Sequence, residues 1–278
     1  MPMFTMISGF LYKDKSLKKV ILKFFYPCII FSLLNNYIGG GIPLYVEKVG
    51  VGYFKIGYTM WYIWALFIYY AILPIAIRKL GWKYLMAIGM SGVFILDFIP
   101  LPNSIFQLCR VINFFPFFLL GMFLKRNLSK VPIIDVPSNI NKFSALTLLI
   151  CILIYVLIVT VYPQAVYDTG MVSNPGFSLS RWVLRCFTYV INTIMIMCLI
   201  FITPDKSFWI TKYSSRTLNV YMLHMSVVFP LCWLIMPEFM FKWFGYLFGL
   251  LVVPAISCVL FSKPIDKIMN ILLGTAKL

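Results

Sequence analysis

The chain has 278 residues, of which 62% are hydrophobic and only 12% are charged. Soluble domains are about 45–50% apolar and about 25% charged, so this composition excludes an ordinary soluble protein and predicts an all-α, polytopic membrane protein. The net charge of +16 would suggest nucleic-acid binding in a soluble protein. Here the basic residues fall in short loops between apolar segments, so the positive-inside rule accounts for them and no nucleic-acid partner is expected.

The first twelve residues, Met1–Tyr12, are apolar but too short to span a bilayer, which takes about 20 helical residues. They lack the basic start and the small-residue cleavage site of a secretory signal peptide. We therefore expect this segment to be the second half of a spanning helix whose first half is missing.

Eight apolar segments long enough to span a bilayer follow this half-span. In chain order they are Val20–Ile38, Thr59–Ile77, Trp82–Ile99, Phe106–Leu124, Phe143–Tyr162, Trp182–Thr203, Arg216–Met236 and Met240–Ser262. Polar loops separate them, among them Lys125–Lys142. No internal repeat or soluble insertion interrupts the pattern, so residues 1–278 are predicted to form a single integral-membrane domain.

The distribution of basic residues predicts how the chain is oriented. Eighteen of the 24 Lys and Arg residues fall in one set of alternate loops, and four fall in the other: Lys48, Lys55, Arg181 and Lys242. The lysine-rich set marks the cytoplasmic side, so the C-terminus is expected there too. The seven cysteines lie in or beside apolar segments without any Cys-x-x-Cys pair, so neither a disulfide framework nor a metal site is predicted.

Two arginines, Arg110 and Arg185, lie about one turn inside spans that are entered from the outer side. A charge within a span usually faces the interior of the bundle, paired with an opposite charge. Asp97, at the outer end of its span, is a candidate partner for Arg110. The alternative is that each arginine snorkels to the lipid headgroups.

The segment from Tyr213 to Pro230 carries His224, the only histidine in the chain. Histidine is the side-chain type that ordinarily changes charge near neutral pH. A titratable group inside an apolar span is costly, so it indicates a functional site. The alternative is a histidine that only forms a hydrogen bond to a neighbouring helix.

Four stretches together resemble one known family. They are the opening Met-Pro-Met-Phe run with Ser8-Gly9, then Lys19-x-x-x-Lys23-x-x-x-Pro27, the segment Arg110–Gly121 that ends Pro-Phe-Phe-Leu-Leu-Gly, and Ser215–His224, which reads Ser-x-x-Leu-x-x-Tyr-x-x-His. In this order they resemble the integral-membrane acyltransferase 3 family, in particular its fucose 4-O-acetylase-like branch. Members of the family begin with a further helix that carries a histidine, and the chain starts after the corresponding point.

The resemblance implies an enzyme that transfers an acyl group, usually acetyl, from cytoplasmic acyl-CoA to a hydroxyl of a surface polysaccharide or its lipid-linked precursor, without a metal. His224 would be catalytic, assisting the family's first-helix histidine where that is present. The remaining roles implied are acceptor or oxyanion binding by Arg110, Asn113, Arg185 and Tyr221, and CoA binding by Lys19 and Lys23. The expected location is the inner membrane of a bacterium.

Two other functions remain open at this stage. A carrier or flippase could use the same basic cavity to move a sugar or an anion, although transporters usually contain internal repeats. An inactive remnant is the other, because the first helix of the family pattern is absent. The DNA just upstream, read in frame for a helix that ends in histidine, would separate the remnant from an enzyme.

Overall fold

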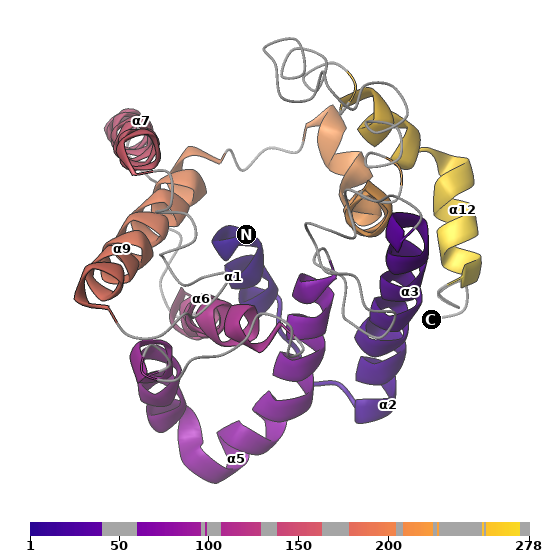
Figure 1. Ribbon diagram of the computed structural model, residues 1–278, viewed down its shortest axis with the longest axis horizontal. Coiled ribbons are helices and arrows are strands. Elements are labelled where there is room, and N and C mark those ends of the chain that lie inside the picture. Colours follow the sequence, from indigo (N-terminus) through magenta and orange to yellow (C-terminus); the bar gives the residue numbers. More distant parts are fainter. Residues whose placement is uncertain are drawn as a thin grey trace. The chain divides into compact units, whose positions relative to one another are not determined.

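The computed structural model describes residues 1–40, 60–95, 98, 107–128, 138–162, 178–203, 208–224, 227, 252 and 254–272. All regular secondary structure in these residues is helical, which confirms the predicted all-α class (Figure 1). The chain forms two compact units. Unit 1 contains Met1–Lys15 and Ile68–Lys206, and unit 2 contains Ser16–Phe67 and Ser207–Leu278.

Four helices in the described part of the chain are long and apolar enough to cross a membrane. They are α5 (Trp61–Ile95), α6 (Leu108–Leu128), α7 (Ser138–Val161) and α9 (Leu179–Ile202). They confirm the membrane character of the chain and coincide with predicted spans. The total of eight spans stays a prediction, since residues 228–251 lie outside the described part.

The loop predicted at Lys125–Lys142 is too long. Helix α6 continues to Leu128, and α7 begins at Ser138. The hydropathy of the sequence drops before the helices end, because flexible lysine and arginine side chains let a helix continue beyond the apolar layer. The polar residues here belong to the helix ends as much as to the loop.

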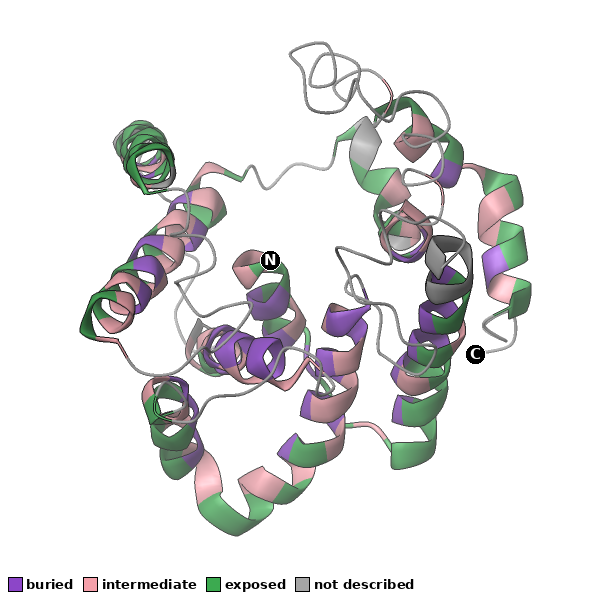
Figure 2. Ribbon diagram, viewed as in Figure 1, coloured by how far each residue is buried: buried purple, intermediate pink, exposed green. Residues whose placement is uncertain are grey.

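Unit 1 is organised around α6. Of the most apolar 18-residue stretch of α6, 56% is buried, compared with 11% of the corresponding stretch of α7. Figure 2 shows the same contrast, with buried residues along α6 and exposed ones along α7. The short helix α1 (Pro2–Phe10) packs against α6. A methyl group added to Gly9 would overlap the backbone carbonyl of Phe118, and one added to Gly121 would overlap that of Met6. Glycine at both positions lets the two backbones approach closely, as is common between membrane helices.

A hydrogen bond connects the segment that follows α1 to the C-terminal end of α6. Lys125 Nζ donates a hydrogen bond of 2.6 Å to the carbonyl oxygen of Tyr12. The Tyr12 hydroxyl donates a 2.6 Å bond to Asp14, and the Tyr12 ring packs on Tyr70 with centroids 4.8 Å apart. Burial, with the bond to Asp14, raises the pKa of Tyr12. The segment after α1 therefore lies against the C-terminal end of α6, where Lys125 is located.

Helix α5 breaks at Gly81, where the backbone has φ 75° and ψ 164° (Figure 1). The break lies at the boundary predicted between two spans, beside Arg78, Lys79 and Lys83. Only glycine adopts this backbone conformation without strain. Residue 81 therefore sets the change of direction between the two halves of α5.

Replacing Gly81 with alanine is expected to destabilise the protein by about 1–3 kcal/mol, because the added Cβ strains this backbone conformation. Gly92 is the matched control: in both positions the added Cβ would meet open space, but only Gly81 has a positive φ. The thermal midpoint of the detergent-solubilised protein should fall for Gly81→Ala and hold or rise for Gly92→Ala. Equal midpoints for the two variants would contradict the assignment.

Unit 2 begins with a continuous helical run formed by α2 (Leu17–Val20), the π-helical turn η1 (Ile21–Phe25) and α3 (Tyr26–Gly40). Pro27 has no N–H and cannot continue the α-helical pattern. Instead, the N–H of Tyr26 bonds to the carbonyl of Ile21, five residues back. The proline thus explains why a π turn forms at this point.

The remainder of unit 2 comes from the start of α5 and from the C-terminal part of the chain. The 3₁₀ helix η3 (Trp209–Arg216) leads into a helix at residues 217–224. A second described helix, residues 254–260, is joined by a short turn to α12 (Lys263–Leu272). Within this unit Phe25 packs against Phe67 from the start of α5, with ring centroids 5.0 Å apart.

Candidate functional site

The residues predicted from sequence fall into two groups. Arg110, Asn113 and Arg185 belong to unit 1, and a second set, comprising Lys19, Lys23, Tyr221 and His224, belongs to unit 2.

The three residues in unit 1 are deeply buried. Arg110 is 4% exposed, Asn113 1% and Arg185 2%. Arg110 and Asn113 lie one turn apart in the first half of α6, and Arg185 lies in the first half of α9. This burial favours arginines that face the protein interior over arginines that snorkel to lipid headgroups. The proposed partner of Arg110, Asp97, lies outside the described residues.

Tyr189 connects this group and was not identified from the sequence. Its hydroxyl donates a hydrogen bond to the backbone carbonyl of Asn113, and its ring stacks on Phe117 at 5.3 Å. Arg185, one turn before Tyr189 on α9, donates a 3.1 Å bond from Nη1 to the carbonyl of Val93. These bonds tie α9 to both α6 and α5, with the buried arginines about one turn from the Asn113–Tyr189 bridge.

A cavity of about 280 Å³ lies next to this bridge. Its walls come from α5, α6 and α9 and are mostly apolar, with Phe94 and Pro116 among the apolar residues and Thr193 among the polar ones. Val93 and Tyr189, which take part in the bonds just described, also line it. The group therefore combines buried positive charge with an adjacent apolar space, an arrangement common in small-molecule sites.

In unit 2, His224 lies at the end of the described helix 217–224 and is partly buried. Its Nδ1 is 2.7 Å from the carbonyl oxygen of Tyr221 and 3.1 Å from that of Val220. A carbonyl oxygen only accepts, so Nδ1 carries the hydrogen and Nε2 of the neutral ring keeps its lone pair. Both carbonyls belong to the histidine's own helix. The alternative considered from the sequence was a hydrogen bond from His224 to a neighbouring helix.

Two tyrosine rings continue a row of aromatic contacts that begins at His224. The Tyr221 ring lies 6.0 Å from the imidazole, and Tyr62 meets Tyr221 edge-on at 5.6 Å. Tyr62 comes from the first turn of α5 and was not identified from sequence, because nothing in the local pattern relates it to Tyr221. Contacts of this kind are favoured between aromatic groups, and here they connect the imidazole to Tyr62 through Tyr221.

Lys19 and Lys23 lie on the exposed side of α2 and the π turn η1. Lys23 Nζ is 5.9 Å from the centroid of the Phe24 ring. Both lysines are accessible to an anion, and their role in binding CoA stays a prediction. Among the described residues, no three His, Cys, Asp or Glu side chains are placed to hold a metal ion together.

Comparison with protein-family models matches residues 1–263 to the acyltransferase 3 model, described as an acyltransferase domain. The chain belongs to the acyltransferase 3 family. Together with the apolar helices, this family membership identifies the protein as a membrane acyltransferase in general terms. No curated protein and no solved structure matches the chain. The match includes all four sequence motifs and extends over both units.

The structure gives two of the acyltransferase 3 motifs a joint structural role. The opening motif forms α1 and the Arg110–Gly121 motif forms most of α6, and these helices pack together through Gly9 and Gly121. A third motif contains the π turn next to Pro27. Thus part of each of these three motifs serves backbone packing or geometry, and the packed α6 helix carries the buried Arg110 and Asn113.

Removal of the Tyr189 hydroxyl tests the bridge between α6 and α9. Tyr189→Phe retains the stacking on Phe117 but removes the side-chain hydrogen bond to the Asn113 carbonyl, and such a bond is typically worth about 0.5–1.5 kcal/mol. We expect a lower thermal midpoint and weaker acyl transfer. Tyr84→Phe is the control, because Tyr84 is 71% exposed; a midpoint for Tyr189→Phe equal to that of this control would contradict the bridge.

Proposed function

We propose that this acyltransferase moves an acetyl group from cytoplasmic acetyl-CoA to a hydroxyl of a surface polysaccharide, or of its lipid-linked precursor, in the inner membrane of a bacterium. The observation that carries the proposal is the family match over residues 1–263, which contains both the buried Arg110 and the motif that ends at His224. The C-terminus would lie in the cytoplasm, as the distribution of basic residues predicts.

The imidazole geometry suits proton transfer. With Nδ1–H held by the backbone carbonyls, Nε2 can accept the proton of the acceptor hydroxyl as that oxygen attacks the thioester carbonyl carbon. The tetrahedral intermediate then expels the CoA thiolate, which takes up a proton, and the acetyl ester remains on the acceptor. In the complete family pattern, a first-helix histidine takes the role of base, and His224 assists it.

The basic groups supply binding in this scheme. Arg110 and Arg185, with Asn113, would bind the acceptor or stabilise the oxyanion of the intermediate. Lys19 and Lys23 would hold the phosphates of CoA as point charges, and Tyr221 would contact the acceptor beside His224. The surrounding membrane lipids complete the protein's partners.

The test follows acetyl transfer from radiolabelled acetyl-CoA to glycan in membrane vesicles whose cytoplasmic face is outward. Replacing His224 with alanine should lower the rate about 10²–10⁴-fold, the usual contribution of a general acid or base. Lys212→Ala, an exposed change in the preceding 3₁₀ helix, should leave the rate unchanged. Full-rate transfer by His224→Ala would refute the role of His224.

The carrier and the inactive remnant predict other outcomes in the same vesicles. A carrier would move labelled sugar or anion across the membrane without forming an acetyl ester. A remnant would give neither result. Formation of the acetyl ester only when both this protein and acetyl-CoA are present would support the enzyme over the carrier and the remnant.

A further inference from the structure

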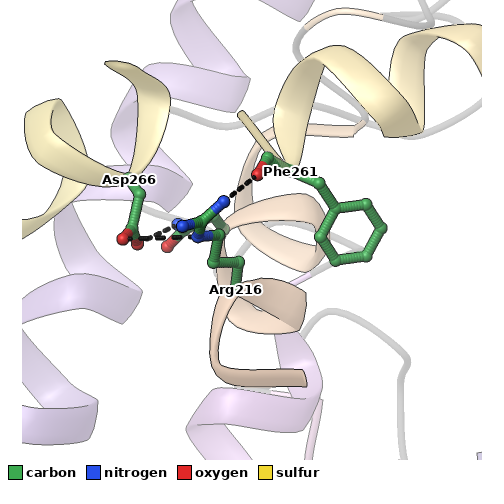
Figure 3. A network of polar contacts seen from close by, with 4 residues as sticks. Arg216, Phe261 and Asp266 are labelled. Carbon is green, nitrogen blue, oxygen red and sulfur yellow. Dashed lines mark hydrogen bonds and ion pairs between the residues drawn. The ribbon is translucent and has the colours of Figure 1, made fainter. Parts of the chain in front are cut away.

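A polar cluster at the base of the His224 helix joins it to the C-terminal helix α12 (Figure 3). Arg216 Nε lies 3.5 Å from Asp266 Oδ2, and Arg216 Nη1 donates a 2.8 Å bond to the carbonyl of Phe261. Asn219 Nδ2 donates a 2.9 Å bond to Asp266 Oδ1. The two oxygens of one carboxylate are thus engaged by two side chains of the segment that leads to His224.

The surroundings strengthen this cluster. The side chains of Arg216 and Asp266 are only 19% and 32% exposed, and Asn219 is 5% exposed. The guanidinium of Arg216 also lies 5.8 Å from the centroid of the Tyr213 ring. A partly buried pair with added hydrogen bonds is worth more than a surface ion pair and fixes geometry better.

The cluster holds the His224 helix by the side that carries Asn219. Asn219 and His224 are five positions apart, which places them about 140° apart around the helix. When the helix is held at Asn219, the His224 side chain therefore lies on a different side of the helix, beside Tyr221. A rotation of about 20° would move a side chain near the helix surface by about 2 Å, and displacements of that size matter for proton transfer.

We propose that Asp266 is a positioning residue of the acyltransferase, and that its bonds to Arg216 and Asn219 fix the direction of the His224 imidazole. Asp266 lies beyond residues 1–263, where the family match ends. The C-terminal helix is then part of the catalytic arrangement rather than a tail. The inference rests on the proposed function only for its effect on rate, because the orientation of His224 can be measured without any reaction.

The orientation is tested through the reactivity of the only histidine in the chain. Diethyl pyrocarbonate modifies a neutral imidazole, so its rate in purified protein reports the exposure and protonation of His224. An affinity tag without histidine keeps the signal unique. We expect Asp266→Ala to change the modification rate several-fold and Asp266→Asn to change it less. Lys267→Ala, the adjacent exposed position on α12, should match wild type.

Activity provides the second measurement. Per folded molecule, Asp266→Ala should lower kcat about 10–100-fold with an unchanged KM for acetyl-CoA, because the donor site is not altered. Exchange of the charges, Arg216→Asp with Asp266→Arg, should recover part of both the modification rate and kcat. A double variant no better than its single variants would overturn the proposal.

The two measurements separate this proposal from the proposed function. If the wild-type chain transfers no acetyl group but Asp266→Ala alters the reactivity of His224, the positioning role holds and the enzymatic proposal fails. If transfer occurs and Asp266→Ala leaves both the reactivity of His224 and kcat per folded molecule at wild-type values, the positioning role is refuted. A drop in thermal midpoint alone, with those two values unchanged, also refutes it.

Discussion

Replacing Gly121 with alanine is expected to separate α1 from α6 and, with Gly9→Ala, to cause the largest loss of stability among methyl additions at the described glycines of unit 1. The new Cβ would overlap the carbonyl oxygen of Met6 and lie 2.8 Å from the backbone nitrogen of Phe10. Backbone atoms cannot move away by changing rotamer, so one helix must shift. Overpacking usually costs about 1–3 kcal/mol, and we expect this position to reach or exceed the upper value.

Two other glycines make this prediction specific. At Gly89 an added Cβ would meet the end of the Leu119 side chain, which can rotate, and at Gly92 it would meet open space. The thermal midpoint in detergent should therefore be highest for Gly92→Ala, lower for Gly89→Ala and lowest for Gly121→Ala. Gly9→Ala, whose Cβ would meet the Phe118 carbonyl, should resemble Gly121→Ala. An order that ignored these contacts would contradict the close packing of α1 on α6.

Much of the fold could be predicted from the sequence, because in a bilayer a long apolar segment is restricted to helix. The segments at α6, α7 and α9 lie where the sequence placed them, and Gly81 breaks α5 at the predicted boundary. Helix ends were less well predicted, since hydropathy marks the apolar layer and not the last hydrogen bond.

The pairing of helices could not be predicted in the same way. Gly9 and Gly121 are far apart in the sequence, and nothing in either segment identifies the other as its partner. The candidate site shows the same limit. Sequence pattern found Arg110, Arg185 and His224 because charge or titration within a span is unusual. Tyr189 and Asp266 are ordinary for their segments, and only their contacts across the fold, to Asn113 and Arg216, distinguish them from their neighbours.

Replacing Arg185 with glutamine is expected to reduce acetyl transfer about 10²–10³-fold, the usual effect of removing one donor that stabilises an oxyanion. Glutamine keeps an N–H donor that can serve the Val93 carbonyl but removes the positive charge. Arg185→Lys keeps the charge without the planar fork of donors, so it should retain more activity than glutamine. The measurement is kcat per folded molecule, with the folded fraction determined by size-exclusion chromatography.

Arg181 provides the matched control because it lies one turn earlier on α9 and is only partly buried. Arg181→Gln removes the same charge from the same helix and should leave kcat within about twofold of wild type, since a partly exposed charge is screened. If Arg185 serves only to hold α9 to α5, Arg185→Gln will lower the thermal midpoint without lowering kcat per folded molecule. That result would confine Arg185 to a structural role and leave Arg110 as the arginine of the proposed site.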